Sequence, residues 1–435
     1  MVEREPVPIS GVYAVSALGR GADAQLAGVL AGSPAFRPVR RFDTTGRRVT
    51  VAATLPDVGT LPDELADAID AACRAAGLDA VARAGSALLL ATHGGPLSQP
   101  VAFAGDRPAV GPARIAPDAG PTGSPAGPVD PGRGPNSGRG PNSGRGPNPG
   151  RRPTAPGTFD RGSSGGPEVP ALAGHLARRC GLGGPTRIYT SACVSASTAV
   201  ADAATMIRRG DVARVVVAAG YLVEPDQFAL FDTGRALAAD GAVRPFSAGR
   251  QGLLLGDGVA AMVLESAGAA RSRGAAPVAT VCGWGRAGDA YHPCQPDPGG
   301  RGLARAVRSA LCRAGRDAEA VGYVNANATG TGFSDASEAA ALWLALGDVA
   351  GRVPVSSTKS VHGHALEASG LLELVVTVQA LRHGKLPVNA GWLGPDEACP
   401  LDVITDAPRP IGTPYALSLN AAFGGANTAL LVAAP

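Results

Sequence analysis

The stretch that decides the fold is residues 188–197, Ile-Tyr-Thr-Ser-Ala-Cys-Val-Ser-Ala-Ser. A short apolar segment runs into small residues and then into an alanine-rich segment, which predicts a sharp strand-to-helix turn holding Cys193. A helix N-terminus carries partial positive charge and free N–H groups, which lower the pKa of a thiol and favour the nucleophilic thiolate. A buried structural cysteine is the usual state of a free cysteine. From this stretch alone, the catalytic and the structural interpretation of Cys193 are equally open.

On both sides of this stretch, short apolar runs alternate with helical patterns. Helical patterns cover 194–208, 302–314, 335–346 and 365–382. Apolar runs typical of buried strands lie at 215–218, 259–264, 277–282, 321–325, 353–356 and 416–419. This alternation predicts an α/β fold with a mixed or parallel sheet, in which functional residues gather at strand ends and helix starts.

The composition excludes several classes of protein. The chain has 435 residues, 45% of them hydrophobic and 17% charged, with a net charge of +3. This balance argues against a disordered chain and against a nucleic-acid partner, which calls for a strong basic excess. No apolar run is long enough to span a membrane, and the acidic N-terminus lacks a secretory signal pattern, so a cytoplasmic protein is expected.

Seven cysteines form no CxxC pair, which favours neither a disulfide framework nor a zinc site. The six cysteines other than Cys193 lack its sequence context. They are interpreted as core or incidental residues: Cys73, Cys180, Cys282, Cys294, Cys312 and Cys399.

Residues 104–168 differ in composition from the rest of the chain. They hold 14 Pro and 16 Gly in 65 residues, with a repeated six-residue unit that starts at Gly132, Gly138 and Gly144. Such a segment cannot bury enough apolar surface to offset the entropy lost on ordering, so it is predicted to be a disordered insertion. Its arginines offer a contact for a polyanion, but a tolerated surface insertion is the favoured interpretation.

Two further segments supply candidate partners for Cys193. A strand leads into a polar, glycine-bearing turn at 323–332, and another strand leads into Lys359-Ser360-Val361-His362-Gly363-His364. His364 is expected at the start of the helix predicted for 365–382, with its ring directed into a site, whereas His362 has the opposite parity. Together with Cys193, these residues favour a Cys/His site over an isolated structural histidine.

Several motifs in chain order resemble those of the β-ketoacyl synthase family, the condensing enzymes of fatty-acid and polyketide synthesis. The resemblance covers nearly the whole chain apart from 104–168. The motifs are Ile9-Ser10-Gly11, Arg41-Phe42-Asp43, Ser191-Ala192-Cys193-Val194-Ser195-Ala196, Arg244-Pro245-Phe246 with Gly256-Asp257-Gly258, Lys359-Ser360-x-x-Gly363-His364, and Asn420-Ala421-Ala422-Phe423-Gly424-Gly425-Ala426-Asn427.

The resemblance implies a thiolase-like fold, with two pseudo-repeated halves stacked in five α-β-α-β-α layers. Residues 1–103 and 169–268 would form the N-terminal half, which carries the nucleophile. Residues 269–435 would form the C-terminal half, which carries the remaining site residues. It further implies an acyl carrier protein as partner, with substrates on its phosphopantetheine or on coenzyme A, no other cofactor and no metal. A homodimer, or a heterodimer with a related subunit, is expected.

The resemblance also implies residue roles. Cys193 would take the acyl group, and its N–H with that of Phe423 would form an oxyanion hole. His364 would stabilise the attacking enolate, and Lys359, paired with Glu373, would orient the site. Phe423 would also gate Cys193, and the substrate would be bound by Thr329, Thr331, Ala421 and Phe423.

The chain departs from the family pattern at its first catalytic histidine, which is Asn327 here. An Asn amide donates a hydrogen bond to an enolate oxygen but exchanges no proton near neutral pH, which puts decarboxylation in doubt. Ala421, in place of a phenylalanine, is expected to widen the pocket. Ala196 replaces the usual glycine of the nucleophile turn.

Three classes of function stay open on these residues. The first is an enzyme acylated on Cys193, which performs decarboxylative condensation, plain acyl transfer, or aldol or lactone closure of a carrier-bound chain. The second is a non-catalytic partner similar to a chain-length factor, which the retained Cys193 argues against. The third, a thiolase-type enzyme, is disfavoured by the Lys359–His364 motif and by the lack of a second cysteine in the C-terminal motif. Decay of an inactive relative also accounts for Asn327.

Overall fold

The computed structural model describes residues 5–93 and 169–435, so the insertion predicted at 104–168 lies outside the described residues. The strands are β1 (Val7–Ser16), β2 (Gly19–Arg20), β3 (Arg37–Pro38), β4 (Val51–Ala52), β5 (Ala87–Ala91), β6 (Thr186–Tyr189), β7 (Arg214–Tyr221), β8 (Gly258–Glu265), β9 (Ala279–Gly288), β10 (Val321–Asn325), β11 (Pro354–Ser356), β12 (Lys385–Leu386), β13 (Asp402–Val403), β14 (Arg409–Pro410), β15 (Tyr415–Ala422) and β16 (Ala426–Ala433).

The α-helices are α1 (Ala22–Ala31), α2 (Leu61–Ala75), α3 (Ala80–Ala84), α4 (Val169–Arg179), α5 (Ser195–Arg208), α6 (Pro225–Thr233), α7 (Ala267–Ser272), α8 (Arg301–Ala314), α9 (Gly332–Leu346), α10 (Lys359–His362) and α11 (Ser369–His383). Two short 3-10 turns matter for the site: η1 (Ala192–Val194) and η4 (Leu366–Ala368).

The large sheet contains the same strand arrangement twice. The N-terminal half has the order β6-β5-β7-β8-β1, and the C-terminal half has the order β11-β10-β15-β16-β9. In both halves the first three strands in this order run parallel to one another. Each of the last two strands runs antiparallel to the strand before it. The halves meet where β1 pairs antiparallel with β9, from Val7 opposite Val281 to Ile9 opposite Ala279. The mixed α/β fold and the pseudo-repeat expected from the sequence are therefore confirmed.

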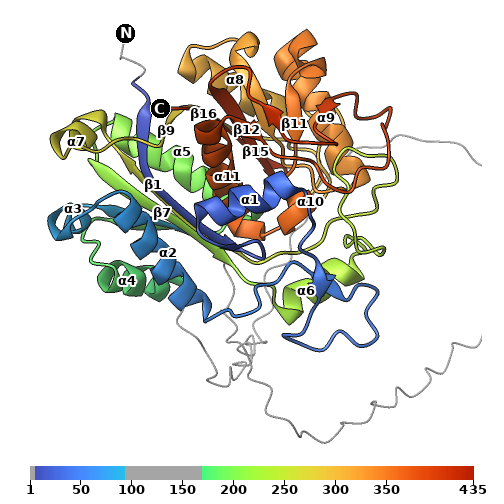
Figure 1. The fold of residues 1–435 in the computed structure, drawn as a ribbon, viewed down its shortest axis with the longest axis horizontal. Helices are drawn as coiled ribbons and strands as arrows, with labels where there is room; N and C mark the ends of the chain where they lie inside the picture. The colour runs from blue at the N-terminus through green and yellow to red at the C-terminus, as the bar shows by residue number, and fades with distance from the viewer. Residues whose placement is uncertain (1–4, 94–168) are drawn as a thin grey trace, which may run out of the picture. The chain divides into compact units, whose positions relative to one another are not determined.

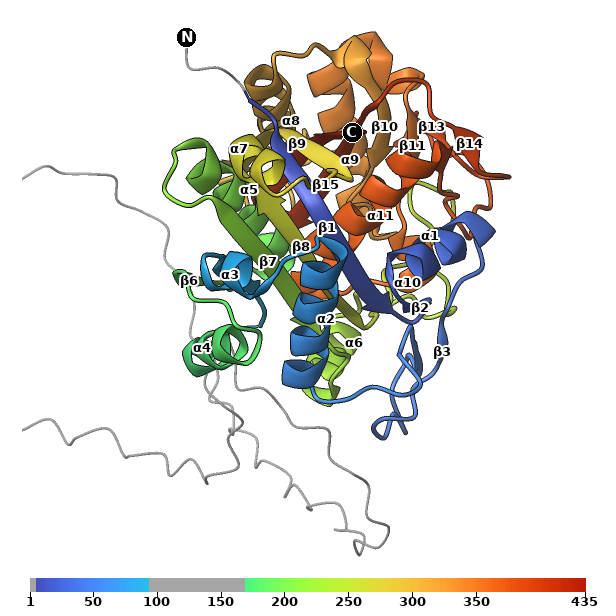
Figure 2. The same ribbon diagram turned by 60° about the vertical axis from the view of Figure 1, so that its left-hand side comes forward.

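Helices cover both faces of each half, which explains why strands such as β5, ALLLA, and β7, RVVVAAGY, are buried along their whole length. Helices α2 and α4 pack on the outer face of the N-terminal half, and α8 with α9 covers the outer face of the C-terminal half. Helices α5 and α11 lie between the two sets of strands, at the centre of Figure 1. Figure 2 shows α2 in front of the long strand β1. This stacking gives the five expected layers.

Several element boundaries differ from the sequence prediction. The helix predicted for 365–382 begins only at Ser369, because residues 366–368 form the turn η4 instead. Leu366 has a positive φ of 41°, which interrupts a continuous helix there. The strand predicted for 277–282 begins at Ala279 and continues to Gly288, because it pairs with β16 along that length.

The pseudo-repeat places the two central helices at equivalent points. Helix α5 follows β6, the first strand in the order of the N-terminal half, and α11 follows β11, the first strand in the order of the C-terminal half. The segments that lead into these helices carry Cys193 and His364. The fold therefore brings together residues 171 positions apart in the chain.

Candidate active site

Cys193 sits in the tight turn between β6 and α5. The preceding residue, Ala192, has a positive φ of 51°, a conformation that side chains rarely adopt and that a small residue tolerates best. Cys193 belongs to η1 and is 9% exposed. The sharp strand-to-helix turn predicted from residues 188–197 is confirmed.

His364 faces Cys193 across the middle layer. Its Nε2 lies 3.2 Å from Cys193 Sγ, within contact distance for proton exchange. The preceding Gly363 has a φ of +75°, and a Cβ there would lie 2.8 Å from the Leu255 carbonyl oxygen, so only glycine fits. The His364 N–H then donates to the Leu254 carbonyl. A strand-like bridge, and not the expected helix start, holds His364 in place.

Ser369 supports the imidazole from the other side and was missed by the sequence analysis. His364 Nδ1 lies 2.8 Å from Ser369 Oγ, which also accepts a hydrogen bond from the Ala365 N–H at 3.0 Å. The hydroxyl therefore fixes the ring with Nε2 toward Cys193. The available signal was a hydroxyl residue five positions after His364, too common a pattern to interpret without the fold.

Burial controls the protonation of this pair. It raises the pKa of the Cys193 thiol to about 12, with the negative charge of Glu367 acting in the same direction. The expectation that the helix start lowers this pKa is therefore wrong, because loss of solvent outweighs the N–H groups of the turn. Burial, helped by the positive charge of Lys359, lowers the pKa of His364 well below its usual value. A neutral thiol beside a neutral imidazole results at neutral pH.

Asn327 follows β10 and lies in the wall of the same site. It is 3% exposed, and its backbone N–H donates to Glu338 Oε1 at 2.8 Å. Its side-chain Oδ1 has no hydrogen-bond partner. The Asn327 side-chain oxygen is therefore an acceptor that no described group of the protein uses.

Lys359 and Glu373 form a buried ion pair, as the resemblance implies. Lys359 Nζ lies 2.6 Å from Glu373 Oε1, and the two side chains are 1% and 0% exposed. Asn420 Nδ2 donates to Glu373 Oε2 at 2.8 Å. Neither charged residue lines the cavity above Cys193, so both act on the site from behind its wall.

A cavity of about 460 Å³ opens above Cys193. Seven of the predicted site residues line it: Cys193, Asn327, Thr329, Thr331, His364, Ala421 and Phe423. Phe423 is 56% exposed, and its ring stacks on Phe231 with centroids 6.2 Å apart. Cys294, interpreted from the sequence as a core or incidental residue, lines this cavity and is exposed, so it is not a core residue.

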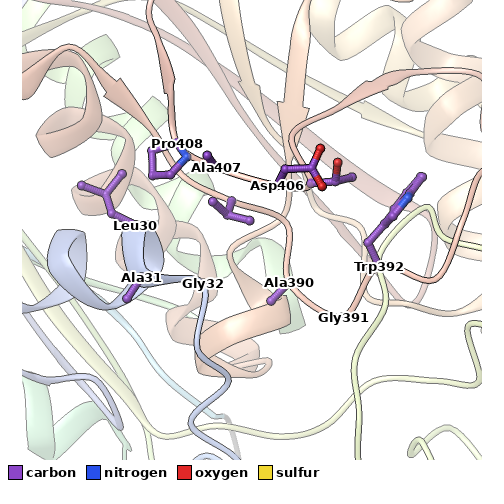
Figure 3. Close-up of a pocket in the computed structure, with 11 residues that line it drawn as sticks. Leu30, Ala31, Gly32, Ala390, Gly391, Trp392, Asp406, Ala407 and Pro408 are labelled. Carbon is purple, nitrogen blue, oxygen red and sulfur yellow. The ribbon is translucent and has the colours of Figure 1, made fainter.

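A second pocket, of about 490 Å³, lies away from these residues. Figure 3 shows Leu30, Ala31 and Gly32 from the end of α1 on one side, with Trp392 and Asp406 on the other. It contains none of the predicted site residues. Over residues 5–93 and 169–435, no group of three or more His, Cys, Asp or Glu side chains has a metal-binding arrangement. The same residues form no helix long and apolar enough to cross a bilayer.

The doubled strand order, the two central helices and the Cys–His pair define a protein of the thiolase-like class. Sequence comparison narrows this class. Residues 161–270 match the N-terminal domain of β-ketoacyl synthases, and residues 278–392 match their C-terminal domain. The chain belongs to the β-ketoacyl synthase family.

Two curated relatives illustrate the similarity. Nodulation protein E of Rhizobium meliloti is 40% identical over 262 residues, which is 60% of this chain and 64% of that protein. The 3-oxoacyl-[acyl-carrier-protein] synthase 2 of Staphylococcus aureus is 33% identical over 270 residues, 60% of this chain and 67% of the relative. The chain thus spans slightly less than two thirds of nodulation protein E.

Two solved structures match nearly the whole chain. A β-ketoacyl synthase from Burkholderia phymatum STM815 superposes with a TM-score of 0.78 at 27% identity, covering 99% of this chain and 100% of that one. The ishigamide ketosynthase/chain length factor has a TM-score of 0.79 at 24% identity, with the same coverage. The second likeness supports the fold alone.

Proposed function

We propose that this protein is a β-ketoacyl synthase-like acyltransferase. In this proposal, Cys193 takes an acyl group from a thioester, and a Claisen-type condensation then forms a carbon–carbon bond in polyketide or fatty-acid biosynthesis. The observation that carries the proposal is the 3.2 Å contact between Cys193 Sγ and His364 Nε2 at the base of the 460 Å³ cavity. Membership of the β-ketoacyl synthase family supports it.

Acyl loading begins from the neutral Cys–His pair. As Cys193 Sγ attacks the thioester carbon, the free lone pair of His364 receives the thiol proton, which then leaves with the departing thiol. Backbone N–H groups of Cys193 and Phe423 would stabilise the oxyanion of this step. The Cys193 sulfur–carbon bond forms as the carbon–sulfur bond of the donor breaks, so the step needs no redox partner or metal.

Condensation would use the other wall of the cavity. A malonyl thioester releases carbon dioxide to give an enolate, whose carbon attacks the acyl carbon while the Cys193 sulfur leaves. The Asn327 side-chain N–H would donate to the enolate oxygen. His364 Nε2 would donate as well once the ring changes tautomer and Nδ1 accepts from the Ser369 hydroxyl. Lys359 and Glu373 hold the surrounding segments from behind, and Thr329, Thr331 and Ala421 would line the path of the pantetheine arm.

Asn327 favours a second candidate reaction within the same scheme. Its amide binds an oxyanion but cannot accept or deliver a proton at neutral pH, unlike an imidazole. Acyl transfer without decarboxylation, or aldol or lactone closure of a carrier-bound chain, requires only the Cys193 and His364 chemistry. The fate of malonyl thioesters separates this candidate from condensation.

An acyl carrier protein is the proposed donor and acceptor of the chains. Exposed Arg235 stands in the wall of the cavity, where a guanidinium suits the phosphate of a phosphopantetheine arm. We further propose a homodimer or a heterodimer with a related subunit. In the described residues, β6 is an outer strand of the sheet with exposed Thr186 and Arg187, and such an edge pairs readily with a second chain.

Intact-protein mass spectrometry tests the proposal. The protein is incubated with acetyl, butyryl and malonyl thioesters on a carrier protein, beside Cys193→Ala and the matched control Cys312→Ala at an exposed cysteine outside the cavity. Wild type and the control should gain an acyl mass that Cys193→Ala lacks. An adduct that persists in Cys193→Ala, or none with any donor, would count against the proposal. The latter outcome would favour a non-catalytic subunit.

A further inference from the structure

Two cysteines line the 460 Å³ cavity, and they differ in exposure. Cys193 is buried at its base, whereas Cys294 is exposed in its wall. All seven cysteines lie in the described residues, and only Cys294 and Cys312 are exposed. Cys312 lies on α8 and does not line the cavity. Cys294 is therefore the one exposed thiol that a molecule entering the cavity meets.

The turn that carries Cys294 is held in place by hydrogen bonds on both sides of the thiol. Asp289 Oδ2 accepts from the Asp297 N–H at 3.1 Å, which closes the turn. The Pro293 carbonyl accepts from the N–H of Gly424 at 2.6 Å, and Gly424 belongs to the connection between β15 and β16. These bonds fix the backbone around Cys294, so its thiol stays at the cavity wall.

The polar groups of the same wall indicate what the cavity receives. Asn327 lines the cavity and is 3% exposed, and its Oδ1 has no hydrogen-bond partner. A buried acceptor left unpaired costs free energy, so a group that displaces water from the cavity must bring a donor. The guanidinium of Arg235 in the wall suits a phosphate. A pantetheine arm carries amide N–H donors and ends in a thiol, and in coenzyme A and in carrier proteins it begins at a phosphate.

Thiol–disulfide exchange is the reaction that joins such an arm to Cys294. The Cys294 thiolate attacks one sulfur of a pantetheine disulfide, and a new sulfur–sulfur bond forms as that of the reagent breaks. The second pantetheine leaves as a thiol and takes up the proton that Cys294 has lost, so no further oxidant is needed. Cys193 is the poorer partner, because burial raises its pKa to about 12 and keeps its thiol protonated.

We propose that Cys294 is a modification site that holds a pantetheine thiol, from coenzyme A or from a carrier protein, as a mixed disulfide. The attached arm occupies the cavity and excludes acyl thioesters from Cys193, and reduction of the disulfide restores access. This inference rests on the proposed function for the identity of the arm. The exchange at Cys294 itself needs no catalysis by Cys193 or His364.

The test treats the full-length protein with coenzyme A disulfide, or with two holo carrier proteins joined through their arms, and maps the adducts by peptide mass. Coenzyme A disulfide should modify Cys294 about tenfold faster than Cys312, the effect of about one charged hydrogen bond to the arm. Hydroxyethyl disulfide lacks the arm and should modify the two cysteines within about threefold of each other. Equal rates with coenzyme A disulfide and with the carrier disulfide would overturn the inference, whereas the reagent that shows the preference identifies the source of the arm.

Acyl loading of Cys193 shows whether the adduct blocks the cavity. The modified wild type and the matched control Cys312→Ser should load at least about tenfold more slowly than before treatment and recover with dithiothreitol. Treated Cys294→Ser should keep its own untreated rate.

Equal losses in Cys294→Ser, or full loading after complete modification of Cys294, would overturn the inference and leave the proposed function intact. So would a Cys193–Cys294 disulfide formed without an adduct. No loading in any untreated protein would overturn the proposed function alone. Labelling of Cys193 by iodoacetamide at alkaline pH then tests the block, which predicts slower labelling once Cys294 is modified, and unchanged labelling would overturn it.

Discussion

Replacement of Lys359 by methionine is expected to destabilise the protein strongly. Lys359 is 1% exposed and lies 2.6 Å from Glu373, which is fully buried. Burial raises the pKa of Glu373, and the Lys359 charge opposes that rise. Removing one partner of such a pair leaves an uncompensated carboxylate and costs about 3–5 kcal/mol.

The double variant Lys359→Met/Glu373→Gln isolates the pair. Its neutral amide still accepts the Asn420 hydrogen bond, so most of the lost stability should return, with a coupling energy of about 2 kcal/mol or more. Lys385→Met is the matched control, because Lys385 is exposed and is the only other lysine in the sequence.

Urea unfolding followed by circular dichroism measures these differences. The destabilisation of Lys359→Met should shrink at acidic pH, because protonation of Glu373 removes the unpaired charge. A loss below about 1 kcal/mol for Lys359→Met, or equal losses for the single and double variants, would refute the reasoning that this pair is desolvated and mutually compensating.

Three further predictions concern the Cys–His site. Asn327→His should increase carbon dioxide release from a malonyl thioester by about tenfold or more, since an imidazole exchanges protons where an amide does not. The release of radiolabelled carbon dioxide measures this rate. An unchanged rate would show that Asn327 is not what limits decarboxylation. Ser369→Ala should slow acyl loading of Cys193 by about tenfold, because it frees the His364 ring and leaves the Ala365 N–H unpaired. Stopped-flow kinetics measure the loading rate, and Ser369→Thr should recover part of it. Iodoacetamide should label Cys193 slowly at neutral pH and faster with each rise in pH toward 12, because the thiol stays protonated below its raised pKa. A labelling rate that reaches its plateau near neutral pH would contradict a thiol of raised pKa.

The sequence predicted the parts of the fold that depend on local pattern. Buried strands such as β10 appear as apolar runs with the bounds that the structure shows, and the small residues before Cys193 indicate the turn. The site residues of the C-terminal half were found because their motif follows the family pattern. Those inferences need only spacing and residue type.

The remainder depends on packing between distant segments. The bridge between Leu255 and His364 replaces the expected helix start, and nothing local to His364 indicates it. The pKa of Cys193 rises because the folded chain excludes water, an effect that reverses the expectation drawn from the helix N-terminus alone. The placements of Ser369 and Glu367 beside the site follow from the turn η4, which a continuous helical pattern concealed.

The doubled strand order has a consequence for how this protein could be taken apart. The nucleophile belongs to one repeat and its imidazole to the other, and the connection between the repeats is the stretch around α7. Two fragments divided near residue 274 would each keep a complete strand set, yet neither would hold a working pair. Acylation of Cys193 would then occur only after the two fragments pair again through β1 and β9. The divided chain could therefore serve as a split reporter, with acylation as its signal.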